Sequence, residues 1–221
     1  HHFFGIIRLA KSIKSQKKGA NPMVNQICPN DHTPDAFSDA FKKLKIGNLM
    51  RKSNITKSCG ISAYEVFHFL LLLAFQGKNL FRFLNSKHKD QAVSKNTYYR
   101  FLNETSYNWS KFLLLLAVKV TTIFDTLTRP ARVKVLILDD SVIKRNRSKS
   151  VELLARIYDH VEHKYQKGFT LLTLGWSDGY SFIPTGFNML SSANKSNRYN
   201  EVSSQIDHRT NGYKFRRESM M

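Results

Sequence analysis

A largely aliphatic run, Val133 to Leu138, constrains the fold of this 221-residue chain most strongly, because it leads directly into Asp139-Asp140-Ser141. Continuous β-branched and aliphatic residues are typical of a strand buried on both faces. A carboxylate is costly to bury without compensation, so we expect the acidic pair to mark the strand's end. The ends of central strands are where α/β folds place reactive groups. The run therefore predicts a buried strand that delivers carboxylates to a functional edge.

The pattern before this strand is helical, and it changes at about Arg129-Pro130. Ser62 with Glu65 three residues later forms a capping box at the start of a helix. Gly77 is a suitable stop at the end of that helix. Ser94 or Asn96 is expected to cap a later helix. The expected helices are 35–49, 63–77, 79–84, a segment through 98–102, and 108–127, the last with Trp109, Phe112, Leu116 and Ile123 facing inward.

The pattern after the boundary predicts two further strands, Phe169 to Trp176 and Tyr180 to Leu190. The Asp178-Gly179 pair between them is a favoured hairpin turn, and Pro184 indicates an edge strand or a bulge. We predict an α/β (α+β) chain with a basic arm at 1–22, a helical region at 23–129 and a sheet region at 130–221.

The charge balance points to a polyanionic partner. The chain has 35 basic and 16 acidic residues, a formal net charge of +19, and 42% hydrophobic residues. Such a field attracts nucleic acid first and an anionic membrane second, although a basic ribosomal or secreted protein has the same property. The apolar runs 67–75 and 112–118 fall short of the roughly 20 residues that span a bilayer. Two cysteines without zinc-ligand spacing suit a reducing, cytoplasmic compartment.

The helix that begins near Lys95 has the chemistry of a DNA-reading helix. A helix-turn-helix protein reads bases with residues near the start of its second helix. Arginine pairs with guanine, asparagine with adenine, and lysine with phosphate. We therefore expect Lys95, Asn96, Tyr99 and Arg100 to contact DNA, with Tyr98 and Phe101 in the core. A plain helical bundle fits the pattern equally well.

The acidic pair and the basic run that follows it suit a phosphodiester substrate. Carboxylates are hard oxygen ligands for Mg²⁺ or Mn²⁺, and two such ions can promote phosphodiester cleavage. Strand alternation points Asp139 and Asp140 to opposite faces, so we do not expect both to hold the same ions. Solvated acids and a solvated basic loop are the alternative. The cations expected to hold phosphates are Lys144, Arg145, Arg147 and Lys149.

Several segments together resemble insertion-sequence transposases with an RNase H-like catalytic domain. The resemblance extends from about Met23 to the end of the chain. The segments that carry it are Val135–Lys144, Ser148-Lys149, Tyr158-Asp159-His160, Lys167-Gly168-Phe169, Leu172–Gly179, Asn96–Leu102 and Asn108-Trp109. It implies an Asp-Asp-Glu triad that binds two divalent ions, Mg²⁺ or Mn²⁺, in the complete enzyme. It also implies that the helical region binds DNA and that the sheet is a truncated RNase H-like sheet.

The resemblance assigns the first triad position and leaves two open. The first Asp is typically followed two positions later by Ser or Thr, which selects Asp139, with Asp140 as second choice. Asp178, Asp207 and Glu218 do not match the second Asp or the Glu, and 211–218 looks like the element between strands. We expect a catalytically incomplete fragment.

The resemblance also implies partners and a location. The expected partners are terminal inverted repeats and target DNA, with a homodimer as the family's usual assembly and no membrane. The expected location is the bacterial-type cytoplasm, at the nucleoid. A non-enzymatic DNA-binding regulator is the competing hypothesis, and it gives Asp139 no role.

Overall fold

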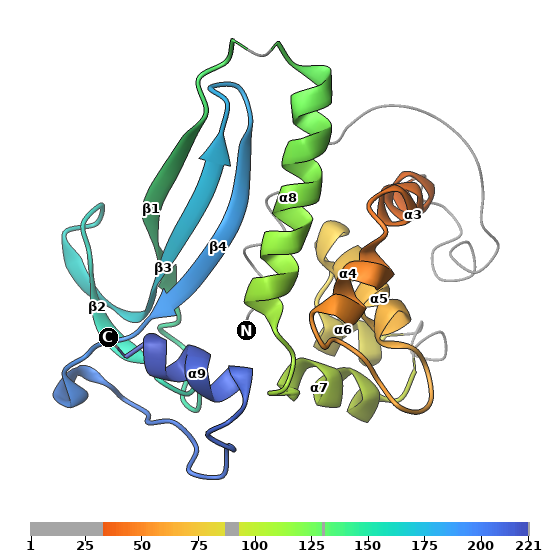
Figure 1. Ribbon diagram of the computed structural model, residues 1–221. Coiled ribbons are helices and arrows are strands. Elements are labelled where there is room, and N and C mark those ends of the chain that lie inside the picture. Colours follow the sequence, from red (N-terminus) through yellow and green to blue (C-terminus); the bar gives the residue numbers. More distant parts are fainter. Residues whose placement is uncertain (1–32, 87–92, 130, 221) are drawn as a thin grey trace. The chain divides into compact units, whose positions relative to one another are not determined.

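The computed structural model describes residues 33–86, 93–129 and 131–220, and the chain divides between Glu104 and Thr105 into two compact units (Figure 1). The predicted basic arm at 1–22 lies outside the described residues. The secondary structure changes from helical to extended near residue 130, as expected. The last helix before that change nevertheless belongs to the second unit, together with the sheet.

The first unit consists of helices α3 (Thr33–Lys43), α4 (Ile46–Lys52), α5 (Ala63–Phe75), α6 (Leu80–Leu84) and α7 (Lys95–Asn103). The prediction of one helix over 35–49 is wrong, because two helices occupy this stretch. Lys45 between them has a left-handed backbone with φ of 51°. A left-handed residue interrupts the α-helical hydrogen-bond pattern, so the chain starts a new helix at Ile46.

The predicted signals around α5 are confirmed. The Ser62 hydroxyl accepts from Glu65 N at 3.1 Å, and the Glu65 carboxylate accepts from Ser62 N at 3.0 Å. Gly77 follows the helix with a φ of +67°, the left-handed geometry of a helix stop. Asn79 caps α6 by accepting from Phe81 N at 2.8 Å. Phe69 of α5 packs against Phe83 and Tyr98, which joins α6 and α7 to the core.

The second unit begins with α8 (Trp109–Leu127), whose N-cap Asn108 accepts from Lys111 N at 2.9 Å. The helix packs along one strand of the sheet, β4 (Phe182–Leu190), as Figure 1 shows. Phe112 is fully buried, as predicted. Ile123 is 41% exposed, so the prediction that it faces inward is wrong. The helix is exposed along much of its last two turns, where Leu127 is also uncovered.

The sheet is antiparallel and contains β1 (Val135–Lys144), β2 (Ala155–Asp159), β3 (Lys164–Ser177) and β4. The long strand β3 is central. It pairs along one edge with β1 and along the other with β2 and then β4. The sequence interpretation missed β2, which pairs with the first part of β3 across a four-residue connection, 160–163.

The prediction that the first strand is fully buried is wrong. From Val135 to Ser141, every residue of β1 is exposed, and Leu136 and Leu138 are 67% and 64% exposed. The physical reason is position. Among the described residues β1 pairs only with β3, so it forms an edge of the sheet, and neither of its faces is covered over this stretch.

The predicted hairpin between β3 and β4 is confirmed. Gly179 has a φ of +88°, and Asp178 Oδ1 accepts from the Tyr180 and Ser181 amides at 3.1 and 2.7 Å. The register shifts at Leu174/Gly175, opposite Pro184, which confirms the expected irregularity at this proline.

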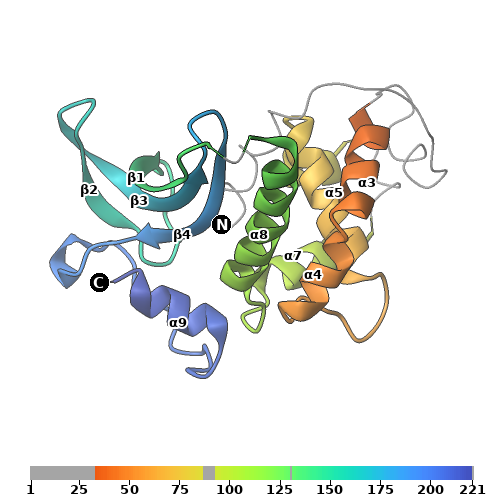
Figure 2. The same cartoon turned by 45° about the horizontal axis from the view of Figure 1, so that its top comes forward.

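The remaining elements close one end of the sheet. The short helix η3 (Lys195–Asn197) is followed by α9 (Asn211–Glu218), which lies beside the end of β4 (Figure 2). Leu153, Leu154 and Phe169 form a buried cluster, against which Ile143, Met189 and Met220 pack. The chain is therefore a mixed α/β protein, as predicted, with helices followed by a four-stranded antiparallel sheet. Among the described residues, no helix combines the length and the apolar character that crossing a bilayer requires.

Candidate functional site

The structure places the predicted catalytic residue near the middle of β1, which continues to Lys144, so the prediction that the acidic pair marks the end of the strand is wrong. Asp139 lies opposite Thr173 of the central strand β3, and Asp140 lies opposite Leu172. Adjacent residues of a strand point to opposite faces, so the two carboxylates do not converge. Both side chains are exposed. Asp139 therefore lies on a strand of the sheet, at its open edge, and is accessible to a ligand.

The described residues around Asp139 do not by themselves fit a two-ion site. Two divalent cations need several oxygen ligands brought together. Within residues 33–86, 93–129 and 131–220, no group of three or more His, Cys, Asp or Glu side chains could hold a metal ion. Asp139 can supply one hard oxygen donor, and the other ligands have no assigned position here.

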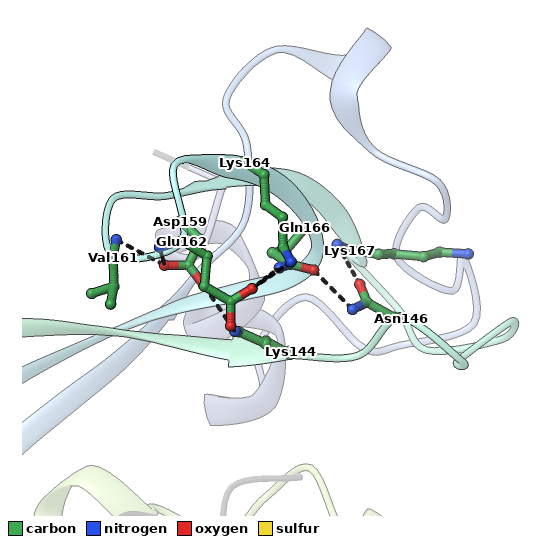
Figure 3. Close-up of polar contacts among 8 residues, drawn as sticks. All are labelled: Lys144, Asn146, Asp159, Val161, Glu162, Lys164, Gln166 and Lys167. Carbon is green, nitrogen blue, oxygen red and sulfur yellow. Dashed lines mark hydrogen bonds and ion pairs between the residues drawn. The ribbon is translucent and has the colours of Figure 1, made fainter.

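The basic run begins at the last residue of β1, and its first member has acidic partners. Lys144 Nζ lies 3.1 Å from Asp159 Oδ2, at the end of β2, and also contacts Glu162 in the connection to β3 (Figure 3). Asp159 Oδ1 accepts from the Val161 and Glu162 amides at 3.0 and 3.1 Å. Lys144 is therefore part of a network that joins the end of β1 to the β2–β3 hairpin.

These contacts shift the pKa values of all three charged groups. The Glu162 amide and then the Lys144 ammonium hold the pKa of Asp159 below its ordinary value. Hydrogen bonds from Lys144 and Lys164 lower the pKa of Glu162. The hydrogen bonds to Glu162 and Asp159 raise the pKa of Lys144. All three groups therefore stay charged around neutral pH.

The network continues into the loop after β1. Gln166 Nε2 donates to Glu162 Oε2 at 2.8 Å, and Gln166 Oε1 accepts from Asn146 Nδ2 at 2.8 Å. The Asn146 side chain accepts from Lys167 N at 2.9 Å, and Arg145 N donates to Lys167 O at 2.6 Å. The loop that carries the other predicted cations is thus fixed to β3. Arg147 and Lys149 are exposed on it, and Arg145 is partly buried.

The predicted DNA-reading residues lie on the exposed side of α7. Lys95, Asn96, Tyr99 and Arg100 are all exposed, while Tyr98 and Phe101 are each 2% exposed, as predicted. The spacing explains this division, because positions i, i+1, i+4 and i+5 share one side of a helix. The Lys95 ammonium lies 5.7 Å from the centre of the Tyr99 ring. The helix therefore presents cationic and amide groups on its exposed face, while the aromatic rings of Tyr98 and Phe101 pack its opposite face into the core.

Sequence reasoning gave no role to the acidic side of the hairpin network. Asp159 is 3% exposed and bound to Lys144, yet sequence reasoning named it only within Tyr158-Asp159-His160, one of the segments that carry the resemblance. The signal was the alternation of Ala155, Ile157 and Asp159 with exposed residues. A half-buried strand alternates in this way. An acidic residue at its buried end requires a cationic partner.

Comparison with known proteins identifies the family. The sequence profile of the DDE superfamily endonucleases matches residues 65–211, which is more than half of the chain and includes α7, β1 and the hairpin network. A search of curated proteins and a search of solved structures found no match. The profile match confirms the family predicted from the sequence segments. The chain belongs to the DDE superfamily endonucleases.

Proposed function

We propose that this chain acts as the transposase of an insertion sequence, binding the terminal inverted repeats and taking part in DNA strand cleavage and transfer. The observation that carries the proposal is the place of Asp139, on an accessible strand paired to the centre of the sheet, within the segment that matches the endonuclease family. Asp139 is the proposed first carboxylate of the triad, and Asp140 is the second choice.

The proposed metal chemistry needs more ligands than these residues bring together. Mg²⁺ or Mn²⁺ is the proposed cofactor of the complete enzyme, with Asp139 as one ligand. Because the described residues contain no group of three or more His, Cys, Asp or Glu side chains that could hold a metal ion, we expect this part of the chain to bind DNA without cutting it.

Two surfaces are proposed to hold DNA. On α7, Arg100 and Asn96 have the donors and acceptors that read base edges, while Lys95 and Tyr99 suit the backbone. On the loop after β1, Arg145, Arg147 and Lys149 are proposed to bind phosphates. Lys144 already has Asp159 and Glu162 as partners, so we expect it to contribute least to DNA binding.

A binding selection followed by a cleavage assay tests the proposal. The purified chain is used to select duplexes from a random-sequence pool, and the selected duplex is then incubated with the chain and Mg²⁺ or Mn²⁺. We expect binding and no cleavage. Arg100→Gln should cost about 1–3 kcal/mol of specific affinity and relax the preference at one base pair. Lys111→Gln, an exposed change on α8, serves as the matched control.

Two results would contradict the proposal. The absence of any selected sequence would contradict the DNA-reading role of α7. Robust cleavage by this chain that survives Asp139→Asn would contradict the role of Asp139. In a protein that also carries the second Asp and the Glu, Asp139→Asn should abolish cleavage while leaving binding intact. A regulator without enzymatic activity predicts that the substitution changes nothing.

A further inference from the structure

One face of the β2–β3 hairpin carries aromatic and cationic side chains that the proposed function does not use. We define the aromatic–cationic face by its six residues: Arg156, Tyr158, His160, Tyr165, Lys167 and Tyr199. Arg156 and Tyr158 are the exposed positions of β2, and Lys167 and Tyr165 lie opposite them on β3. Residues paired in this way share a face of the sheet. The hairpin thus places two tyrosines and two cations side by side.

Direct contacts join these side chains into one surface. The Arg156 guanidinium lies 3.8 Å from the centre of the Tyr165 ring, and the rings of Tyr158 and Tyr165 are 5.2 Å apart. The His160 ring lies 5.0 Å from that of Tyr158.

The surface continues past the hairpin to Tyr199. Tyr199 N donates to Leu154 O at 2.7 Å, which fixes Tyr199 next to the start of β2. The Lys167 ammonium lies 4.5 Å from the centre of its ring. The face therefore extends over β2, β3 and the segment after η3.

The tyrosine rings remain open to solvent despite these contacts. Tyr165 is 59% exposed, Tyr199 is 54% exposed and Tyr158 is 39% exposed. Exposed aromatic rings grouped on one surface are unusual without a ligand, because each ring offers a large apolar area.

The acidic residues of the hairpin lie on its other side. Asp159 and Glu162 are bound by Lys144 and Lys164, in the network that Figure 3 shows. Lys164 pairs with Asp159 in the strand register, away from the exposed positions of β2. The charged residues of the aromatic–cationic face, Arg156 and Lys167, are both cations. Its charge therefore complements an anionic ligand, and its rings complement a flat one.

We propose that the aromatic–cationic face binds single-stranded DNA, with bases stacked on Tyr158, Tyr165 and Tyr199 and phosphates held by Arg156 and Lys167. Proteins that bind single strands without sequence preference combine a cationic path with stacked aromatic side chains. A duplex keeps its base faces stacked inside, so exposed rings favour unpaired bases. The inference rests on the proposed function for the nature of the partner, DNA, and adds a second, single-strand site to it.

Binding of a single strand and of a matched duplex tests this inference. The full chain is titrated with oligodeoxythymidine of about 15 nucleotides, and separately with the duplex selected above, with fluorescence anisotropy as the readout. Tyr165→Leu should weaken single-strand binding by about 5- to 150-fold, and duplex binding by less than about twofold. Tyr165→Phe should retain single-strand affinity because the ring remains.

Further variants separate stacking from charge. Arg156→Gln should lower the slope of log K against log salt for the single strand by about 0.7. Tyr180→Leu is the matched control. Tyr180 is also an exposed tyrosine (84%) with an arginine, Arg132, over its ring, but it lies in the β3–β4 turn, outside the aromatic–cationic face. Photocrosslinking with 5-iodouracil in the oligonucleotide should label Tyr158, Tyr165 or Tyr199. Thermal melting checks that each variant is folded.

The outcomes distinguish this inference from the proposed function. If Tyr165→Leu and Tyr180→Leu have the same effect, or if crosslinks fall outside the face, the inference is overturned. If Tyr165→Leu weakens single-strand and duplex binding equally, the face is a general phosphate-binding surface and the inference is also overturned. The proposed function is tested separately, by duplex binding of Arg100→Gln. If that variant loses duplex binding, the proposed function stands even when one of these results overturns the inference.

Discussion

The two parts of β1 differ sharply in how they are held. In the exposed part, Val135–Asp140, every side chain is exposed, and pairing with β3 holds the backbone. At the packed end, Ile143 lies against the buried cluster of Leu153, Leu154 and Phe169, and Lys144 binds Asp159 and Glu162. One strand therefore has a stabilising end and an accessible part, and Asp139 belongs to the accessible part.

This difference shows how an edge strand can carry a reactive group. Tight packing at one end fixes the register, and register sets the face of every side chain along the strand. Charged residues such as Lys134, Asp139 and Asp140 also protect an open edge from pairing with other chains. The exposed part can therefore present a carboxylate while the packed end provides most of the side-chain stabilisation.

Removing a core side chain at the packed end should produce the largest effect. Leu154→Ala should lower the free energy of unfolding by about 2–5 kcal/mol, because Leu154 is fully buried in the cluster against which Ile143 packs. Leu138→Ala, the matched change in the exposed part, should cost less than about 0.5 kcal/mol. Urea unfolding measures both. Equal losses would mean that the exposed part is as well packed as the other end.

A change at Gly168 should have the next largest effect. A Cβ at Gly168 would lie 2.1 Å from Ile143 O, so the two backbones of β1 and β3 must separate. Gly168→Ala should therefore cost about 1–3 kcal/mol or more. Gly186→Ala is the control, because its Cβ would lie 4.0 Å from Leu174 Cβ, an ordinary contact. Thermal melting of both variants gives the comparison, and a neutral Gly168→Ala would contradict it.

The start of β1 has a separate connection whose strength should depend on pH. Arg132 Nη1 lies 2.6 Å from Asp178 Oδ2, which ties the segment before β1 to the β3–β4 turn. Arg132 and the Ser181 amide lower the pKa of Asp178 from 3.8 to about 2. A carboxylate whose pKa is lower in the folded than in the unfolded state stabilises the fold when the pH is above the unfolded-state pKa. This stabilisation is lost as the pH falls through the folded-state pKa. This stabilisation should therefore be complete above about pH 5 and disappear between about pH 4 and 2.

Asp178→Asn tests that pH dependence. The asparagine oxygen can still accept from the turn amides, but the side chain cannot ionise. The variant should melt at a lower temperature than the parent near neutral pH, and the gap should close on acidification. Arg132→Gln should show the same convergence. A gap that stays constant down to pH 2 would mean that the ion pair does not stabilise the fold.

The helical signals were predictable because they are local. The Ser62–Glu65 capping box, the stop at Gly77 and the division of α7 into Tyr98 and Phe101 against exposed neighbours all depend on residues within one or two turns. The Asp178-Gly179 turn is local as well. The break at Lys45 was not predictable, since lysine gives no sign that it will adopt a left-handed conformation.

The position of β1 in the sheet depends on residues far away in the chain. An aliphatic run indicates a strand, but whether that strand is central or at an edge depends on which other strands pair with it. Among the described residues only β3 pairs with β1, and neither face of its first part is covered, so Leu136 and Leu138 are exposed. The Lys144–Asp159 pair was missed for the same reason, because it joins β1 to β2, two strands on opposite sides of β3 whose placement the sequence does not show.

The smallest effect on stability should come from the residue with the largest proposed role. Asp139→Asn lies in the exposed part of β1, so it should change the free energy of unfolding by less than about 0.5 kcal/mol. Urea unfolding of the variant and the parent measures this change, with Asp140→Asn as the neighbouring control. If Asp139→Asn were as damaging as Leu154→Ala, its carboxylate would be part of the structure, and its proposed role as an accessible ligand would be wrong. If Asp139→Asn is neutral, any effect on cleavage in a protein with the whole triad can be attributed to chemistry rather than to folding.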